Sequence, residues 1–150
     1  MKVLIINGPN LDMLGSREKE VYGEQTLADM NAEIAEFCAA EGMDAVFFQS
    51  NCEGEIVTAI HEARTRFGAD GIVLNAGAYT HYSRAIADAL PCVRVPKVEV
   101  HISNVHAREE FRHVSVLAAN CNGVICGFGA DSYKLACLAL RNIVTKAGRA

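Results

Sequence analysis

The chain has 150 residues, the length of one domain, and we expect a single domain over residues 1–150. Hydrophobic residues make up 51% of the chain and charged residues 21%, with a net charge of −4 and no basic run, so we expect no nucleic acid as a partner. No apolar stretch approaches the roughly 20 residues that a membrane-spanning helix needs, which argues against a membrane protein.

The first ten residues, MKVLIINGPN, hold a short apolar run that is interrupted at Gly8-Pro9, too early for a signal peptide. No small-residue cleavage site follows it. We therefore interpret residues 2–6 as a buried strand and expect a cytoplasmic protein.

Apolar runs and segments of helical period alternate along the rest of the chain. Residues 27–40 show helical spacing, with Thr26 as a plausible N-cap and Gly42 just beyond the end. The remaining expected elements, in chain order, are a strand at 45–48, a helix at 55–67 that stops at Gly68, a strand at 71–74, a helix at 83–90, a strand at 93–100 with a bulge or an edge at Pro96, a strand at 123–127 and a helix at 132–144.

Five continuous apolar strands interleaved with helices predict an α/β fold with a five-stranded parallel sheet that is covered on both faces. Right-handed crossovers favour a three-layer, flavodoxin-like arrangement. In such sheets ligands bind outside the carboxyl ends of the strands. Polar clusters follow four of the expected strands, at 7–10, 49–53, 75–81 and 101–103.

The first polar cluster begins a long segment, NGPNLDMLGSREKEVYG. Gly8-Pro9 predicts a sharp turn, and Asn10 should lie at the edge of the sheet, with Arg17 and Tyr22 on a long loop. A surface loop with a solvated arginine and a packing tyrosine is the alternative. Flavin binding is a further possibility for this fold, but the segment has little of the Ser, Thr and Gly content of a phosphate-binding loop.

The second informative segment is LNAGAYTHYSRAIADAL. Asn75 leaves the strand, Gly77 turns the chain, and Thr80 is a candidate cap that would put His81 in the first turn of the next helix. Asp88 should lie about two turns later. For His81 and Asp88 a structural or solvated position, or a subunit contact for Asp88, stays an alternative.

The third segment, VEVHISNVHAREEFRHVS, offers an oriented acid and several donors. Glu99 and His101 are two residues apart on a strand and should point to the same face, which Ser103 continues. A carboxylate beside an imidazole can fix its tautomer and increase its basicity. Arg108 and Arg112 share a face if the segment is helical, and guanidinium groups bind carboxylates.

Neither the histidines nor the cysteines have the spacing of a metal site. The six cysteines contain no C-x-x-C pair, and we interpret them as reduced thiols that fill gaps in the core. His101, His106 and His113 match no metal motif, so we expect no metal.

Taken in order, these segments resemble the type II dehydroquinase family, the 3-dehydroquinate dehydratases. The resemblance runs from residue 2 to about residue 140 through NGPNL with Arg17 and Tyr22, QSNCEGEIVTAIHEA, NAGAYTHYSRAIADAL and VEVHISNVHAREEFRHVS. It implies a single catalytic domain, a hydro-lyase of the shikimate pathway and aromatic amino acid biosynthesis. The expected substrate is 3-dehydroquinate, from which water is eliminated through an enolate to give 3-dehydroshikimate.

The resemblance also implies a role for individual residues. Tyr22 corresponds to the base, and Arg17 to the mobile-loop arginine that favours ionisation of that tyrosine. His101 corresponds to the acid that protonates the departing hydroxyl, with Glu99 orienting it, while Asn10 helps to hold this region. The implied substrate-binding residues are Asn75 (stabilising the enolate through a water), His81, Asp88 (reaching a neighbouring subunit's active site), Ile102 (through its backbone), Ser103, Arg112 and, less directly, Arg108.

The family assembles as trimers packed into dodecamers and uses no cofactor or metal, so the resemblance implies a cofactor-independent homo-oligomer. Two other functions stay open on the residues alone. One is a flavodoxin-like domain that binds a small anion without catalysis, for which a tyrosine base such as Tyr22 beside Arg17 would be unnecessary. The other is a flavin electron carrier.

Overall fold

The computed structural model describes residues 1–16 and 24–148 and has one five-stranded sheet at its centre. All neighbouring strands are parallel, in the order β2-β1-β3-β4-β5, so the predicted parallel α/β sheet is confirmed. The strands are β1 (Lys2–Asn7), β2 (Asp44–Gln49), β3 (Gly71–Asn75), β4 (Lys97–His101) and β5 (Gly123–Cys126).

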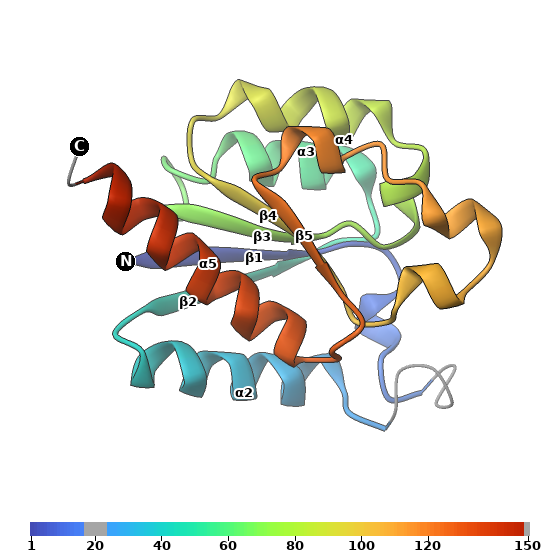
Figure 1. Cartoon of the computed structure of the whole chain (residues 1–150), viewed down its shortest axis with the longest axis horizontal. Coiled ribbons are helices and arrows are strands. Elements are labelled where there is room, and N and C mark those ends of the chain that lie inside the picture. Colours follow the sequence, from blue (N-terminus) through green and yellow to red (C-terminus); the bar gives the residue numbers. More distant parts are fainter. Residues whose placement is uncertain (17–23, 149–150) are drawn as a thin grey trace.

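Helices cover both faces of the sheet, as predicted for a three-layer fold. Figure 1 shows α2 and α5 together on one face and α3 and α4 on the other. Their bounds are α2 (Leu27–Ala40), α3 (Glu53–His61), α4 (Arg84–Ala89) and α5 (Asp131–Ala147). Within the described residues, none of these helices is both long and apolar enough to cross a membrane.

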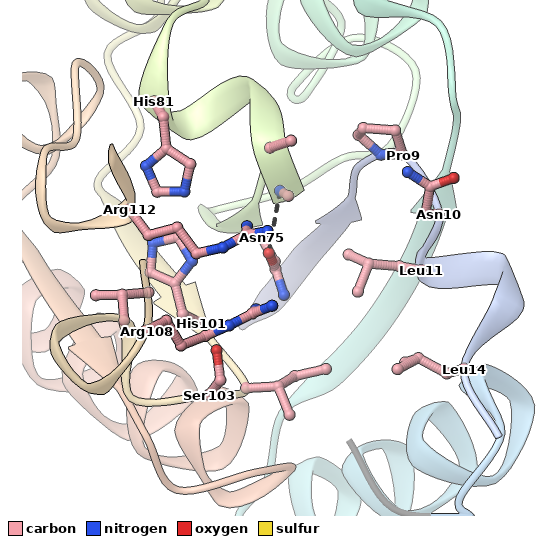
Figure 2. A pocket seen from close by; sticks show the side chains of 14 residues that line it. Pro9, Asn10, Leu11, Leu14, Asn75, His81, His101, Ser103, Arg108 and Arg112 are labelled. Atoms are coloured by element: carbon pink, nitrogen blue, oxygen red, sulfur yellow. Dashed lines mark hydrogen bonds between the residues drawn. The ribbon is translucent and has the colours of Figure 1, made fainter. Parts of the chain in front are cut away.

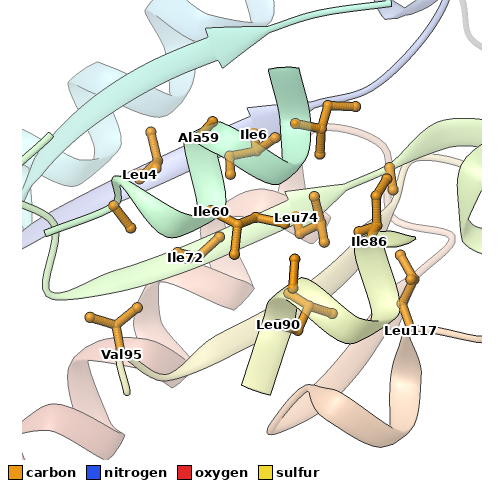
Figure 3. Close-up of a cluster of buried hydrophobic side chains, with 14 of the residues drawn as sticks. Leu4, Ile6, Ala59, Ile60, Ile72, Leu74, Ile86, Leu90, Val95 and Leu117 are labelled. Atoms are coloured by element: carbon orange, nitrogen blue, oxygen red, sulfur yellow. The ribbon is translucent and has the colours of Figure 1, made fainter. Parts of the chain in front are cut away.

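Two hydrophobic cores follow from the alternation of side chains along each strand. Leu4 and Ile6 of β1 point toward α3 and α4, where they pack with Ile60 and Leu90 (Figure 3). Val3 and Ile5 point the other way, into the core under α2 and α5. Every residue of β3 is buried, since both of its faces are covered.

Most helix and strand ends lie within a few residues of their predicted positions, and α2 matches its prediction at both ends. Thr26 caps α2 as expected, with its Oγ1 accepting from the Asp29 backbone N–H at 3.1 Å. The prediction for α3 was too long, because residues 62–67 form turns rather than continuing the helix. These turns end at Gly68, with φ of 63°, where the Ala69 N–H bonds the Ala63 carbonyl.

The predicted strand at 93–100 began too early. β4 begins at Lys97, directly after Pro96, because proline has no N–H to contribute to the sheet. The six cysteines are all free thiols, as expected. The prediction that they fill gaps in the core is confirmed for Cys38 and Cys137, which are buried, but is wrong for Cys52 and Cys92, which are exposed.

Candidate active site

A cavity of about 100 Å³ lies beyond the carboxyl ends of β1, β3 and β4 (Figure 2). Three of the four polar clusters predicted from the sequence meet there. The cavity is lined by Pro9, Asn10, Leu11, Leu14, Asn75, Gly77, Ala78, His81, His101, Ile102, Ser103, Val105, Arg108 and Arg112. This list includes eight of the twelve expected site residues, so segments up to about 100 residues apart in the chain form one site.

Two glycines allow the loops after β1 and β3 to interlock beneath the cavity. The Gly8 N–H donates to the Asn75 carbonyl at 2.7 Å, and a Cβ on Gly8 would lie 2.5 Å from the Ala76 carbonyl oxygen. Gly77 has φ of 57°, and a Cβ there would lie 3.1 Å from the Pro9 oxygen. Only residues without a side chain fit at both positions, which explains the glycines of these two loops.

Asn10 stands in the left-handed region with φ of 66°, which asparagine tolerates better than most residues. Its backbone N–H donates to Asn51 Oδ1 at 2.9 Å. Gln49 Nε2 in turn donates to the same oxygen at 3.1 Å. The polar cluster after β2 therefore does not line the cavity but supports Asn10 at its rim.

A buried hydrogen-bonded chain ends at His101. His101 Nε2 donates to Glu99 Oε1 at 2.7 Å, and the two residues are only 7% and 0% exposed. Ser115 Oγ donates to the other oxygen, Glu99 Oε2, at 2.8 Å, and it accepts from the backbone N–H groups of Leu117 and Ala118. The predicted pairing of Glu99 with His101 is confirmed; Ser115 was not predicted, because it lies 16 residues from Glu99 in an irregular segment.

His81 lines the cavity, but not from the predicted position. It ends a short 3-10 helix, η2 (Gly77–His81), and α4 is capped by Ser83 rather than Thr80, since Ser83 Oγ accepts from the Ile86 N–H at 3.0 Å. His81 Nδ1 lies 2.8 Å from the Val114 carbonyl, to which it can only donate. Burial lowers the pKa of His81, so its ring stays neutral near pH 7 and leaves Nε2 as an acceptor.

Arg108 and Arg112 both line the cavity, although the segment that holds them is not one helix, the condition under which the sequence would put them on a shared helical face. They lie on either side of the start of a 3-10 helix, η5 (Glu110–His113). Glu109 approaches both guanidinium groups, with its Oε2 2.8 Å from Arg112 Nε and 3.6 Å from Arg108 Nε. The two arginines are mostly buried against the site, while Glu109 is 56% exposed, so this wall of the cavity attracts anions.

A second buried chain, not predicted from the sequence, ends at Asn75. Tyr133 of α5 is fully buried, and its hydroxyl donates to Asn7 Oδ1 at 2.7 Å and accepts from Asn75 Nδ2 at 2.8 Å. One feature of the sequence indicated that a partner of this kind is needed. Asn7 continues the buried alternation of Val3 and Ile5, so its polar side chain needs a partner on that face.

Four expected site residues are not among those lining the cavity. Glu99 stands behind His101, as predicted for an orienting group. Asp88 is exposed on α4, away from this cavity. Arg17 and Tyr22 lie outside the described residues. In residues 1–16 and 24–148, no group of three or more His, Cys, Asp or Glu side chains is arranged to hold a metal ion.

Comparisons with known proteins agree on one family. The family model described as "Dehydroquinase class II" matches residues 1–141. A 3-dehydroquinate dehydratase from Nitratiruptor sp. is 54% identical over 143 residues, which are 95% of this chain and 90% of the relative. Another, from Caldicellulosiruptor bescii, is 53% identical over 95% of this chain and 98% of the relative.

Solved structures give the same result. The crystal structure of a type II dehydroquinase from Butyrivibrio crossotus superposes with a TM-score of 0.90 at 50% identity, covering 94% of this chain and 97% of that one. A type II dehydroquinase from Propionibacterium acnes gives a TM-score of 0.86 at 42% identity, covering 96% of each chain.

Proposed function

Because the chain belongs to the class II dehydroquinase family and its activity is that of a hydro-lyase acting on 3-dehydroquinate, we propose that Tyr22 is its base and His101 its acid. The observation that supports the acid is the Ser115–Glu99–His101 chain, which brings a buried, oriented imidazole to the cavity. The carboxylate fixes the orientation of the imidazole, and we assign to His101 the delivery of the proton that a departing hydroxyl needs.

The elimination requires two proton transfers. A base removes a proton from the carbon beside the ketone, and the electron pair forms an enolate. The enolate then expels the hydroxyl group from the neighbouring carbon, and the C–O bond breaks as His101 donates its proton, so that water leaves. A free tyrosine, with a pKa of about 10, is a poor base near neutrality. A guanidinium such as that of Arg17 favours the tyrosinate, because it remains charged.

The other cavity residues fit a small anionic substrate with several hydroxyl groups. Arg108 and Arg112 supply positive charge on one wall, and Ser103 supplies a donor near them. The neutral His81 can accept a hydrogen bond from a substrate hydroxyl through Nε2. We assign stabilisation of the enolate to Asn75, whose amide lies among these groups in Figure 2.

A direct assay tests the proposed function. Purified protein is mixed with 3-dehydroquinate, and the ultraviolet absorbance of the enone product is followed. We expect turnover without any addition. Binding of the substrate with no product would support the alternative of a small-anion-binding domain, and a yellow protein with a flavin spectrum would support an electron carrier.

Activity is expected to survive removal of metal ions. The cavity walls carry two guanidinium groups, and positive charge disfavours a bound cation. Turnover after exhaustive chelation and dialysis should equal that of the untreated protein. Loss of turnover that is restored by one metal ion, and not by dialysis buffer alone, would contradict this prediction.

The protein is expected to form a homo-oligomer in which Asp88 completes the active site of a neighbouring subunit. Asp88 is exposed on α4 and does not line the cavity of its own subunit. Sedimentation at the assay concentration should give an assembly larger than a monomer, and Asp88→Ala should raise the KM. An active monomer would contradict the role across subunits. The dodecamer built from trimers and the cytoplasmic location stay predictions.

A further inference from the structure

The most informative feature that the mechanism does not yet use is the hydrogen-bonded chain from Asn7 through Tyr133 to Asn75. All three side chains are buried, with 1%, 0% and 3% of their surface exposed. Asn7 and Asn75 lie side by side in register on β1 and β3, at the carboxyl ends of the strands. Both continue rows that are otherwise apolar, so burial would be unfavourable without the Tyr133 hydroxyl between them.

The orientation of the Asn75 amide follows from its partners. The Gly77 backbone N–H, 3.2 Å away, can only donate, so the Asn75 atom that faces it is the carbonyl oxygen. The nitrogen then faces Tyr133, and the tyrosine oxygen must accept one of its hydrogens. The Tyr133 hydrogen is thereby directed to Asn7 Oδ1. A flipped Asn75 amide would oppose its nitrogen to the Gly77 N–H and break this arrangement.

We propose that Tyr133 and Asn7 are positioning residues, which hold the Asn75 amide so that its second N–H is presented to the cavity. This inference rests on the proposed function, in which Asn75 stabilises the enolate. An amide free to flip would present its carbonyl oxygen part of the time, and a carbonyl repels a developing oxyanion. Tyr133 does not itself line the cavity, so it acts through Asn75.

Tyr133 keeps this arrangement at every working pH. Burial raises its pKa well above that of a free tyrosine, although the hydrogen bond from Asn75 opposes the effect. The hydroxyl therefore remains protonated and takes no part in proton transfer.

The candidate site is supported from both faces of the sheet. His101 is supported from the face under α3 and α4, and Asn75 from the face under α2 and α5.

The test is a double-mutant cycle on kcat and KM with Tyr133→Phe and Asn75→Ala. Tyr133→Phe removes one oxygen and keeps the ring, and we expect kcat to fall by about 10- to 100-fold with KM changed by no more than about threefold. Asn75→Ala should lower kcat by about 100- to 1,000-fold, as for other oxyanion donors. The double variant should match Asn75→Ala alone, since Tyr133 acts through the group already removed.

A matched control separates positioning from a general loss of packing. Ser132 is also fully buried in the first turn of α5, and its Oγ accepts from the Phe128 N–H at 3.1 Å, outside the chain to Asn75. Ser132→Ala should keep the wild-type kcat even if its thermal stability falls. If Tyr133→Phe does not fold, Asn7→Ala in the same cycle tests the same chain from its other end.

The outcomes distinguish the inference from the mechanism on which it rests. A slow Asn75→Ala combined with a normal Tyr133→Phe would overturn the inference alone. So would losses that multiply in the double variant, because they would show that Tyr133 acts independently of Asn75. A normal kcat for Asn75→Ala would remove Asn75 from the proposed mechanism, and the inference with it.

Discussion

Tyr22→Phe is expected to lower turnover by about 100- to 10,000-fold, the range attributed to general acid–base catalysis. The substitution removes one oxygen, and with it the proposed base, while the other polar groups of the cavity remain to bind the ligand. Affinity for a substrate-like inhibitor should therefore change much less than turnover. Both quantities should be measured on the same preparation, by the enone assay and by calorimetry.

Exchange of substrate hydrogen with deuterium oxide gives a second measurement of this step. Tyr22→Phe should lose the enzyme-catalysed exchange at the carbon beside the ketone, because no enolate forms. Arg17→Ala should retain some turnover. The pH at which its turnover increases should move to more alkaline values, because the ionised form of the tyrosine is no longer stabilised. If Tyr22→Phe turns over at the wild-type rate, Tyr22 is a packing residue and the proposed mechanism is wrong.

His101→Gln is expected to lower turnover by roughly 100- to 10,000-fold for a different reason, the loss of the proton for the departing hydroxyl. Glutamine suits this test because its amide N–H can still donate to Glu99. An alanine there would leave the buried Glu99 carboxylate with only Ser115, and removing one partner of a buried pair costs about 3–5 kcal/mol of stability. Thermal unfolding should therefore change less for glutamine than for alanine.

Tyr22→Phe and His101→Gln should be slow at different steps of the reaction. His101→Gln should still catalyse hydrogen exchange in deuterium oxide, because enolate formation does not need the acid, whereas elimination should be slow. His106→Gln is the matched control, since His106 is exposed on a neighbouring 3-10 helix, η4 (Val105–Ala107), and does not line the cavity. Loss of exchange together with elimination in His101→Gln would show that His101 is not only the acid.

The sequence predicted the order of strands and helices well, because the signals for each element lie within that element or directly beside it. A continuous apolar run such as residues 3–6 can only be a buried strand or a buried helix, and the glycine and proline that follow soon after it mark the end. The cap at Thr26 was predictable because both partners lie within four residues. The N-cap of α4 was predicted wrongly because two nearby residues are both suitable cap residues. Thr80 and Ser83 are both of the type that caps helices, and only Ser83 has the cap geometry.

The sequence by itself also predicted eight of the residues that line the cavity and the pairing of Glu99 with His101. Glu99 and His101 are two residues apart on a strand, and that spacing puts them on one face, where the structure has them hydrogen-bonded at 2.7 Å. The glycines that allow the loops after β1 and β3 to interlock are visible as turn signals in NGPN and NAG. Both signals are local, whereas the interlocking of the two loops joins residues more than 60 positions apart and is seen only in the tertiary structure.

Only the tertiary structure decided which distant groups support these residues. Ser115 reaches Glu99 across 16 positions, and Tyr133 reaches Asn7 across 126, by contacts that no spacing along the chain encodes. Hydrogen bonds depend on the distance and direction between atoms, and for residues this far apart those are set by how helices pack onto the sheet. An asparagine at a buried position of a strand indicates from the sequence that a hydrogen-bond partner is needed, but only the packing of the helices on the sheet decides which side chain is that partner.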